Sequence, residues 1–122
     1  PCGTLFPYTT LFRSDLEALH KRGLELVRER DLEGAAEIFR QILSVDNSHK
    51  ESYNNLGSIA SEYGRFTDAL VLFRRALDID PNYLIARQNL AAVHKRLGAL
   101  DMYISEMRRT RGLKELLRSL FR

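Results

Sequence analysis

The chain has 122 residues, of which 44% are hydrophobic and 29% charged, and no stretch approaches the roughly 18 apolar residues of a membrane-spanning helix. Its single cysteine, Cys2, excludes a disulfide framework and a cysteine-based metal site. The formal charge of +3 is uneven: residues 15–107 hold 12 Lys+Arg against 15 Asp+Glu (−3), whereas residues 108–122 hold 6 against 1 (+5).

Residues 1–14 do not share the pattern of the rest, since they show no helical period and, apart from Arg13, no charge. The run from Thr4 to Ser14 resembles the in-frame translation of a short-read sequencing adapter, and such segments are set aside before the fold is considered. We therefore expect residues 1–14 to be non-native and irregular, with a genuine apolar arm as the alternative. On this interpretation the chain is a fragment whose natural N-terminus is missing, and the cytoplasm is its default location.

Residues 16–49 predict a helical hairpin, because their apolar and small residues occupy the places that lie 34 positions before those of residues 50–83. These residues are Leu19, Gly23, Leu26, Leu32, Ala35, Phe39, Ile42 and Leu43.

Residues 50–83 predict a second hairpin with clearer boundaries. Gly64 stands where the first helix must end, since glycine accepts the left-handed conformation of a helix C-terminus. Ser48 with Glu51 predicts a capping box at the start of the hairpin. Asp80 precedes Pro81, which disfavours helical geometry and closes the unit.

The spacing within residues 50–83 resembles the tetratricopeptide repeat (TPR), a helix–turn–helix unit of 34 residues. The residues that carry the resemblance are Tyr53, Leu56, Gly57, Gly64, Phe66, Ala69, Phe73, Ala76, Leu77 and Pro81. Only Ala60 departs, at a place that is usually aromatic. The resemblance implies an all-α fold, a right-handed α-solenoid of about three TPR hairpins within residues 15–111, and a role in holding another polypeptide.

Residues 84–111 predict a divergent third repeat. Leu90, Ala91 and Gly98 match the pattern and Leu100 begins a second helix, whereas the departures are Arg87, His94, Tyr103, Met107 and Thr110. Residues 112–122 predict an amphipathic C-terminal helix that caps the third repeat, on the spacing of Leu113, Leu116, Leu117, Leu120 and Phe121. Docking on a partner, on a further repeat or on an anionic membrane surface is the alternative.

The sequence contains no recognisable catalytic set. The glycines lie apart rather than in a phosphate-binding loop, and His20, His49 and His94 have no histidine one helical turn away. We therefore expect no enzyme activity, no metal and no cofactor, with packing or surface roles for the histidines.

The resemblance also implies a concave groove lined by the first helix of each repeat. The predicted peptide-binding residues are Asn54, Asn55, Ser58, Gln88, Asn89, Lys95 and Arg96. Their amides can donate and accept hydrogen bonds, which suits the backbone of an extended peptide. The alternative is that the asparagines serve helix packing.

We expect a protein–protein interaction scaffold that binds a peptide or helical segment of another protein. The alternative is an accessory module of a multidomain enzyme, such as a transferase or peptidase, whose catalytic domain is missing here. Attachment of the basic tail to anionic lipid or nucleic acid ranks third, and no specific nucleic-acid partner is expected.

One ligand class is disfavoured by the resemblance. Family members that clamp a chaperone C-terminal carboxylate use basic or amide residues at five places, which here hold His20, Leu24, Asn55, Ile85 and Asn89. Only Asn55 matches, so we do not expect a chaperone-tail clamp.

Overall fold

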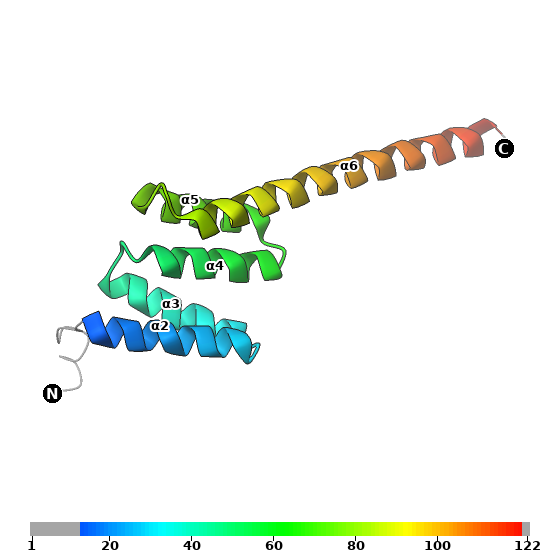
Figure 1. The fold of residues 1–122 in the computed structure, drawn as a ribbon. Coiled ribbons are helices and arrows are strands. Elements are labelled where there is room, and N and C mark those ends of the chain that lie inside the picture. The colour runs from blue at the N-terminus through cyan, green and yellow to red at the C-terminus, as the bar shows by residue number, and fades with distance from the viewer. Residues whose placement is uncertain (1–12, 121–122) are drawn as a thin grey trace.

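The computed structural model describes residues 13–120, apart from the side chains at positions 103, 107, 109, 110, 112, 113 and 116. Every regular element in this range is an α-helix, and the helices are α2 (Arg13–Arg28), α3 (Leu32–Val45), α4 (Lys50–Glu62), α5 (Phe66–Ile79) and α6 (Leu84–Leu120). Helices α2 and α3 form one hairpin, α4 and α5 form the next, and the start of α6 packs on the second (Figure 1). The predicted all-α solenoid of stacked hairpins is confirmed. The adapter-like segment lies outside the described residues except for Arg13 and Ser14, which begin α2.

Both hairpins turn through a residue in the left-handed conformation. This residue is Arg30 (φ 66°) in the first hairpin and Gly64 (φ 73°) in the second. The next residue then donates its N–H back across the helix end, from Asp31 to the carbonyl of Leu26 at 2.9 Å and from Arg65 to that of Ala60 at 2.8 Å. This bond closes the helix end as in a Schellman motif.

The links between successive hairpins also repeat, and they depend on aspartate. Asp46 and Asp80 are the C-cap residues of α3 and α5, and both have extended backbone. Each carboxylate accepts the N–H of the residue two positions on, from Ser48 and from Asn82, at 3.0 Å in both cases. Asp46 makes this turn without a following proline, so the aspartate is the feature that the two links share.

The predicted capping box at the start of α4 is wrong by one residue. His49 is the N-cap, and its Nδ1 accepts the N–H of Ser52 at 3.2 Å. The Ser48 hydroxyl is instead directed toward Asp46, to which it donates at 2.7 Å.

The core depends on a phenylalanine packed against a glycine in each hairpin. Phe39 and Phe73 are buried, with exposed fractions of 0% and 1%. A Cβ added at Gly23 would lie 2.6 Å from Cε1 of Phe39, and one at Gly57 would lie 2.6 Å from Cε1 of Phe73. Since real Cβ atoms do not approach this closely, glycine permits the contact between the two helices of each hairpin.

Neighbouring hairpins share their cores. Ile59 of α4 completes the buried cluster of the first hairpin, and Val93 of α6 completes that of the second. No hairpin therefore buries its apolar residues alone, which is the general property of stacked repeats.

The third unit differs from the prediction, because α6 continues through Gly98 as one helix and residues 112–120 form its end rather than a separate cap. The reason lies on the two faces of α6. Ala86 and Val93 are buried against the body, whereas Arg87 and His94 are exposed. If the third unit were a hairpin, its second helix would have to pack over Arg87 and His94 and bury both polar side chains. Within residues 13–120, residues 84–97 are therefore the last element that packs on the stack, and their outer face is polar, as is typical of a capping element.

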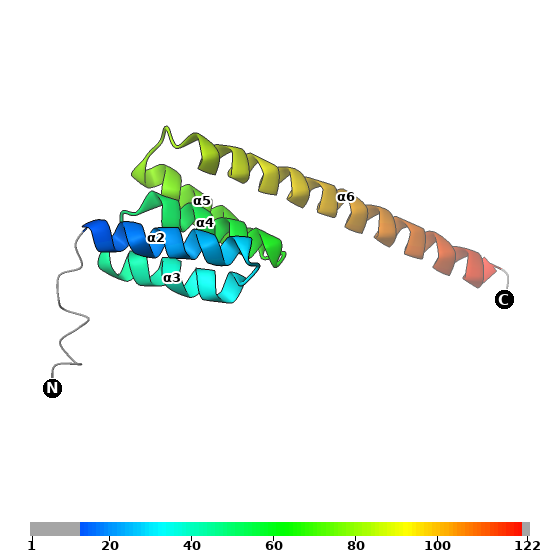
Figure 2. The same ribbon diagram turned by 60° about the horizontal axis from the view of Figure 1, so that its bottom comes forward.

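The remainder of α6, residues 98–120, extends away from the hairpins (Figures 1 and 2). We call this segment the arm. Its described apolar side chains are exposed, and they include Leu100, Met102, Ile104, Leu117 and Leu120.

We predict that alanine has opposite effects on stability at Gly64 and Gly98, which occupy equivalent positions in successive 34-residue units. Gly98→Ala should raise the free energy of unfolding by about 0.5–1 kcal/mol, because alanine is the better helix former and no atom lies within 4 Å of its Cβ. Gly64→Ala should lower it by about 1–2 kcal/mol, because the left-handed backbone disfavours a side chain. Urea denaturation followed by circular dichroism measures both. A loss at Gly98 as large as that at Gly64 would contradict the continuous helix.

Candidate functional site

The first helix of each unit contributes to one continuous surface made by α2, α4 and residues 84–97 of α6. We call it the first-helix surface. Two hydrogen bonds join its helices: Asn89 Nδ2 donates to Asn54 Oδ1 at 3.0 Å, and Asn55 Nδ2 lies 3.3 Å from His20 Nε2. Both bonds join residues 35 positions apart, so the same contact occurs twice along the stack.

The predicted site residues therefore divide into two groups. Asn54 is buried, with 6% exposed, and it is bonded to Asn89, while Asn55 is half-buried against His20. The hydroxyl of Ser58 donates to the carbonyl of Asn54 in its own helix at 3.2 Å. The asparagine side chains thus join neighbouring helices, which is the packing role that the sequence left open, whereas the Ser58 bond lies within α4.

The second group consists of Gln88, Lys95 and Arg96 on α6, and all three are exposed. The Arg96 guanidinium lies 5.7 Å from the centroid of the Phe66 ring, so it is positioned at the turn between α4 and α5. Gln88 and Lys95 are seven residues apart on one face of α6 and carry no described hydrogen bond or ion pair among residues 13–120. They are the predicted residues that the structure leaves available to a ligand.

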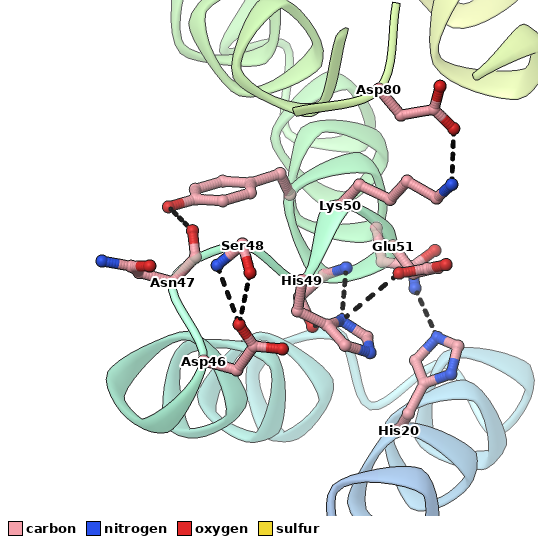
Figure 3. A network of polar contacts seen from close by, with 11 residues as sticks. His20, Asp46, Asn47, Ser48, His49, Lys50, Glu51 and Asp80 are labelled. Carbon is pink, nitrogen blue, oxygen red and sulfur yellow. Dashed lines mark hydrogen bonds and ion pairs between the residues drawn. The ribbon is translucent and has the colours of Figure 1, made fainter. Parts of the chain in front are cut away.

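A polar cluster beside this surface joins α2 to the start of α4 (Figure 3). The rings of His20 and His49 meet edge to face with centroids 5.2 Å apart, and the centroid of the Phe39 ring lies 6.1 Å from that of His20. The hydroxyl of Ser52 lies 2.8 Å from His49 Nδ1, in addition to the capping bond from its N–H. Burial, and then the neighbouring His49, lower the pKa of His20 below its ordinary value, while Glu51 opposes the shift.

An ion pair continues this cluster toward α5. Lys50 donates to the carboxylate of Asp80 across 30 positions of sequence (Figure 3). The Lys50 ammonium also lies 5.0 Å from the centroid of the Tyr83 ring. The hydrogen bond from Lys50, and then the one from the Asn82 N–H, lower the pKa of Asp80. The pair fixes the start of α4 relative to the end of α5.

Sequence reasoning did not identify a second surface feature, an open groove of about 940 Å³ between α3 and α5. We call it the outer groove. Its floor is made by Leu56, Ile59 and Ala60 of α4. The spacing of apolar residues in the sequence does not predict this groove, because the groove forms between the second helices of two hairpins, α3 and α5.

Within residues 13–120, no group of three histidine, cysteine, aspartate or glutamate side chains is arranged to hold a metal ion. None of the helices described for this chain is long and apolar enough to cross a membrane.

Comparisons with known proteins agree with this geometry. A family model for the tetratricopeptide repeat matches residues 51–83. Tetratricopeptide repeat protein 37 of Xenopus laevis is 23% identical over 87 residues, and the match covers 71% of this chain but 6% of the frog protein.

Solved structures of low identity show the same fold. The TPR2AB domain of yeast Sti1, in its complex with pHSP90, matches with a TM-score of 0.67 at 17% identity and covers 85% of this chain and 39% of that one. A mutant of MamA matches with a TM-score of 0.60 at 18% identity and covers 77% of this chain and 69% of that one.

We predict that Asn89 acts in stacking. Asn89→Ala leaves the buried Asn54 amide without its partner and should lower the free energy of unfolding by about 1–3 kcal/mol. Its exposed neighbour is the control, since Gln88→Ala should change stability by less than about 0.5 kcal/mol. The double variant with Asn54→Ala should lose less than the sum of the two single losses. Additive losses in urea denaturation would contradict the contact.

We predict that the stability of the stack falls on mild acidification. Because the pKa of His20 is lowered in the folded chain, the unfolded chain binds the proton first, and stability rises with pH between the lowered value and about 6.5. His20→Gln should flatten the unfolding free energy measured between about pH 5 and pH 7.5. His94→Gln, an exposed change on α6, is the control and should leave the slope of the parent. An unchanged slope in His20→Gln would contradict this assignment.

Proposed function

Since the chain carries a tetratricopeptide repeat at residues 51–83, we propose that it is a protein-interaction scaffold that binds a segment of another protein on its first-helix surface. The observation that carries this proposal is the exposed face of α6 beside the stacked first helices. Ile85, Gln88, Ala92 and Lys95 follow one another at steps of three and four along it, and all four are exposed.

These four side chains offer different contacts to a ligand. Ile85, with 54% exposed, supplies an apolar contact, and the small Ala92 lets a second backbone approach closely. The amide of Gln88 can donate to a peptide carbonyl and accept from a peptide N–H at the same time. An extended or helical segment laid along α6 would therefore find apolar, amide and cationic contacts in that order.

The charge of this surface favours an acidic segment. Lys21 and Arg28 of α2, and Lys95 of α6, are exposed and have no described ion pair among residues 13–120. The acidic Glu62 at the end of α4 already pairs with Arg30 at 3.3 Å. The cations therefore remain available to steer and hold carboxylates of a partner.

A chaperone C-terminal carboxylate does not suit this surface, although the Sti1 structure contains pHSP90. At two of the places where clamp members carry lysine, this chain carries His20, whose Nε2 is engaged by Asn55, and the apolar Ile85. We propose that the ligand is an internal acidic segment held along its length. The role of an accessory module in a multidomain enzyme stays a prediction.

We predict that ligand capture depends on Gln88 and Lys95 and not on outward residues of the second helices. The double variant Gln88→Ala with Lys95→Glu should reduce capture of acidic clones from a peptide display library by about tenfold, which corresponds to about 1.4 kcal/mol. Gln41→Ala with Arg74→Glu, exposed on α3 and α5, is the matched control and should capture like the parent.

Two results would count against the proposal. One is equal capture by the parent and the α6 variant when circular dichroism shows both to be folded. The other is enrichment of basic clones in place of acidic ones, which would remove the charge argument.

A further inference from the structure

The arm of α6 carries two kinds of exposed side chain that the body leaves without a partner surface. Leu117 and Leu120 share one side of the helix and are 45% and 67% exposed. Arg111, Lys114 and Arg118 follow at steps of three and four on another side, and all are exposed. A helix with adjoining apolar and basic sides is suited to a groove that is apolar inside and acidic at its rim.

The outer groove has this character. Its apolar walls include Val71 of α5, with 66% exposed, and Tyr63, with 53% exposed. Three acidic residues line it, namely Glu33 and Glu37 on α3 and Asp68 on α5, together with two basic residues, Arg40 and Arg65, so acids are in excess by one.

The acidic side chains at the rim are able to form ion pairs with basic side chains of another chain. Glu37 is paired with Arg40 at 3.1 Å and Asp68 with Arg65 at 3.3 Å, and in both cases the partners are exposed and three positions apart in sequence. Such pairs exchange partners readily. Glu33 has no described ion pair among residues 13–120.

The distribution of charge along the chain also favours contact between an arm and an outer groove. Residues 15–107 carry a balance of −3 and residues 108–122 one of +5, so two arms repel each other while an arm and a body attract. The contacting part of the arm also fits the length of the groove helices, since residues 111–120 span about 15 Å and α3 and α5, at 14 residues each, are about 21 Å long.

An arm cannot reach the groove of its own chain while α6 is one helix, because it extends away from the hairpins (Figure 2). We propose that the outer groove of one copy binds the arm of a second copy, with Leu117 and Leu120 against the apolar floor and Arg111, Lys114 and Arg118 at the acidic rim. This contact is heterologous, since it joins two different surfaces, and it lies apart from the first-helix surface.

The test separates the two halves of the contact in the full chain. Val71→Glu damages the groove and leaves the arm, whereas Leu120→Glu damages the arm and leaves the groove. Sedimentation velocity at increasing concentration should show association of the parent and at least tenfold weaker association of each variant alone. The control is Leu84→Glu, which changes a similarly exposed apolar residue outside the outer groove and outside the arm. This variant should associate like the parent.

Mixing the two variants gives the decisive measurement. The mixture still contains one intact groove and one intact arm, so it should form a complex of one copy of each and grow no further. Raising the salt from about 50 mM to about 500 mM should weaken that complex several-fold.

Three results would overturn the proposal. The first is association of the parent without a complex in the mixture, which would indicate contact between like surfaces. The second is a parent that stays monomeric at every concentration. The third is a monomeric parent whose arm binds vesicles of phosphatidylcholine with phosphatidylserine, since that result would assign the arm to a membrane surface.

Discussion

The close contact of Phe39 with Gly23, and of Phe73 with Gly57, is the constraint on which the rest of the structure depends. Each phenylalanine fills the space that a Cβ on the facing helix would occupy, and this brings the two helices of a hairpin close enough to share a core. Two hairpins of one shape then stack in one register. The repeated asparagine contacts and the repeated aspartate turns follow from that register, because each places the same residue against the same neighbour.

Stacking also decides which polar residues can bind a partner. An asparagine that points along the stack meets the next first helix, so Asn54, Asn55 and Asn89 are engaged in the structure. A polar residue one helical step away faces solvent, as Gln88 does. No other helix of residues 13–120 covers the outward face of α6, so this face presents its side chains to solvent.

The features that could be predicted from the sequence are those that follow from the repeating spacing of residues. The features that could not be predicted depend on one particular neighbouring side chain. The helices, the glycine turn at Gly64 and the two paired hairpins could all be predicted, since each follows from spacing that occurs twice. The cap at His49 could not, because Ser48 fits the motif equally well until Asp46 engages its hydroxyl. Gly98 was misleading for a similar reason. Its place in the repeat predicts a turn, but a turn forms only if a second helix can pack, and Arg87 and His94 prevent that. The role of the asparagines was left open by sequence, since amide groups suit peptide binding and helix packing equally.

The arm follows from the same physics at the end of the stack. A helix whose outer face is polar stops the addition of hairpins, so the chain after Gly98 has no place in the core and continues as helix into solvent. Its apolar side chains are then left exposed, which is unfavourable for an isolated chain. Segregation of positive charge onto this segment keeps arms from pairing with each other and directs them toward acidic surfaces. Within this chain, the outer groove combines acidic residues with an apolar floor. The interruption of the repeat thus creates the arm, and the preceding repeats create the groove that suits it.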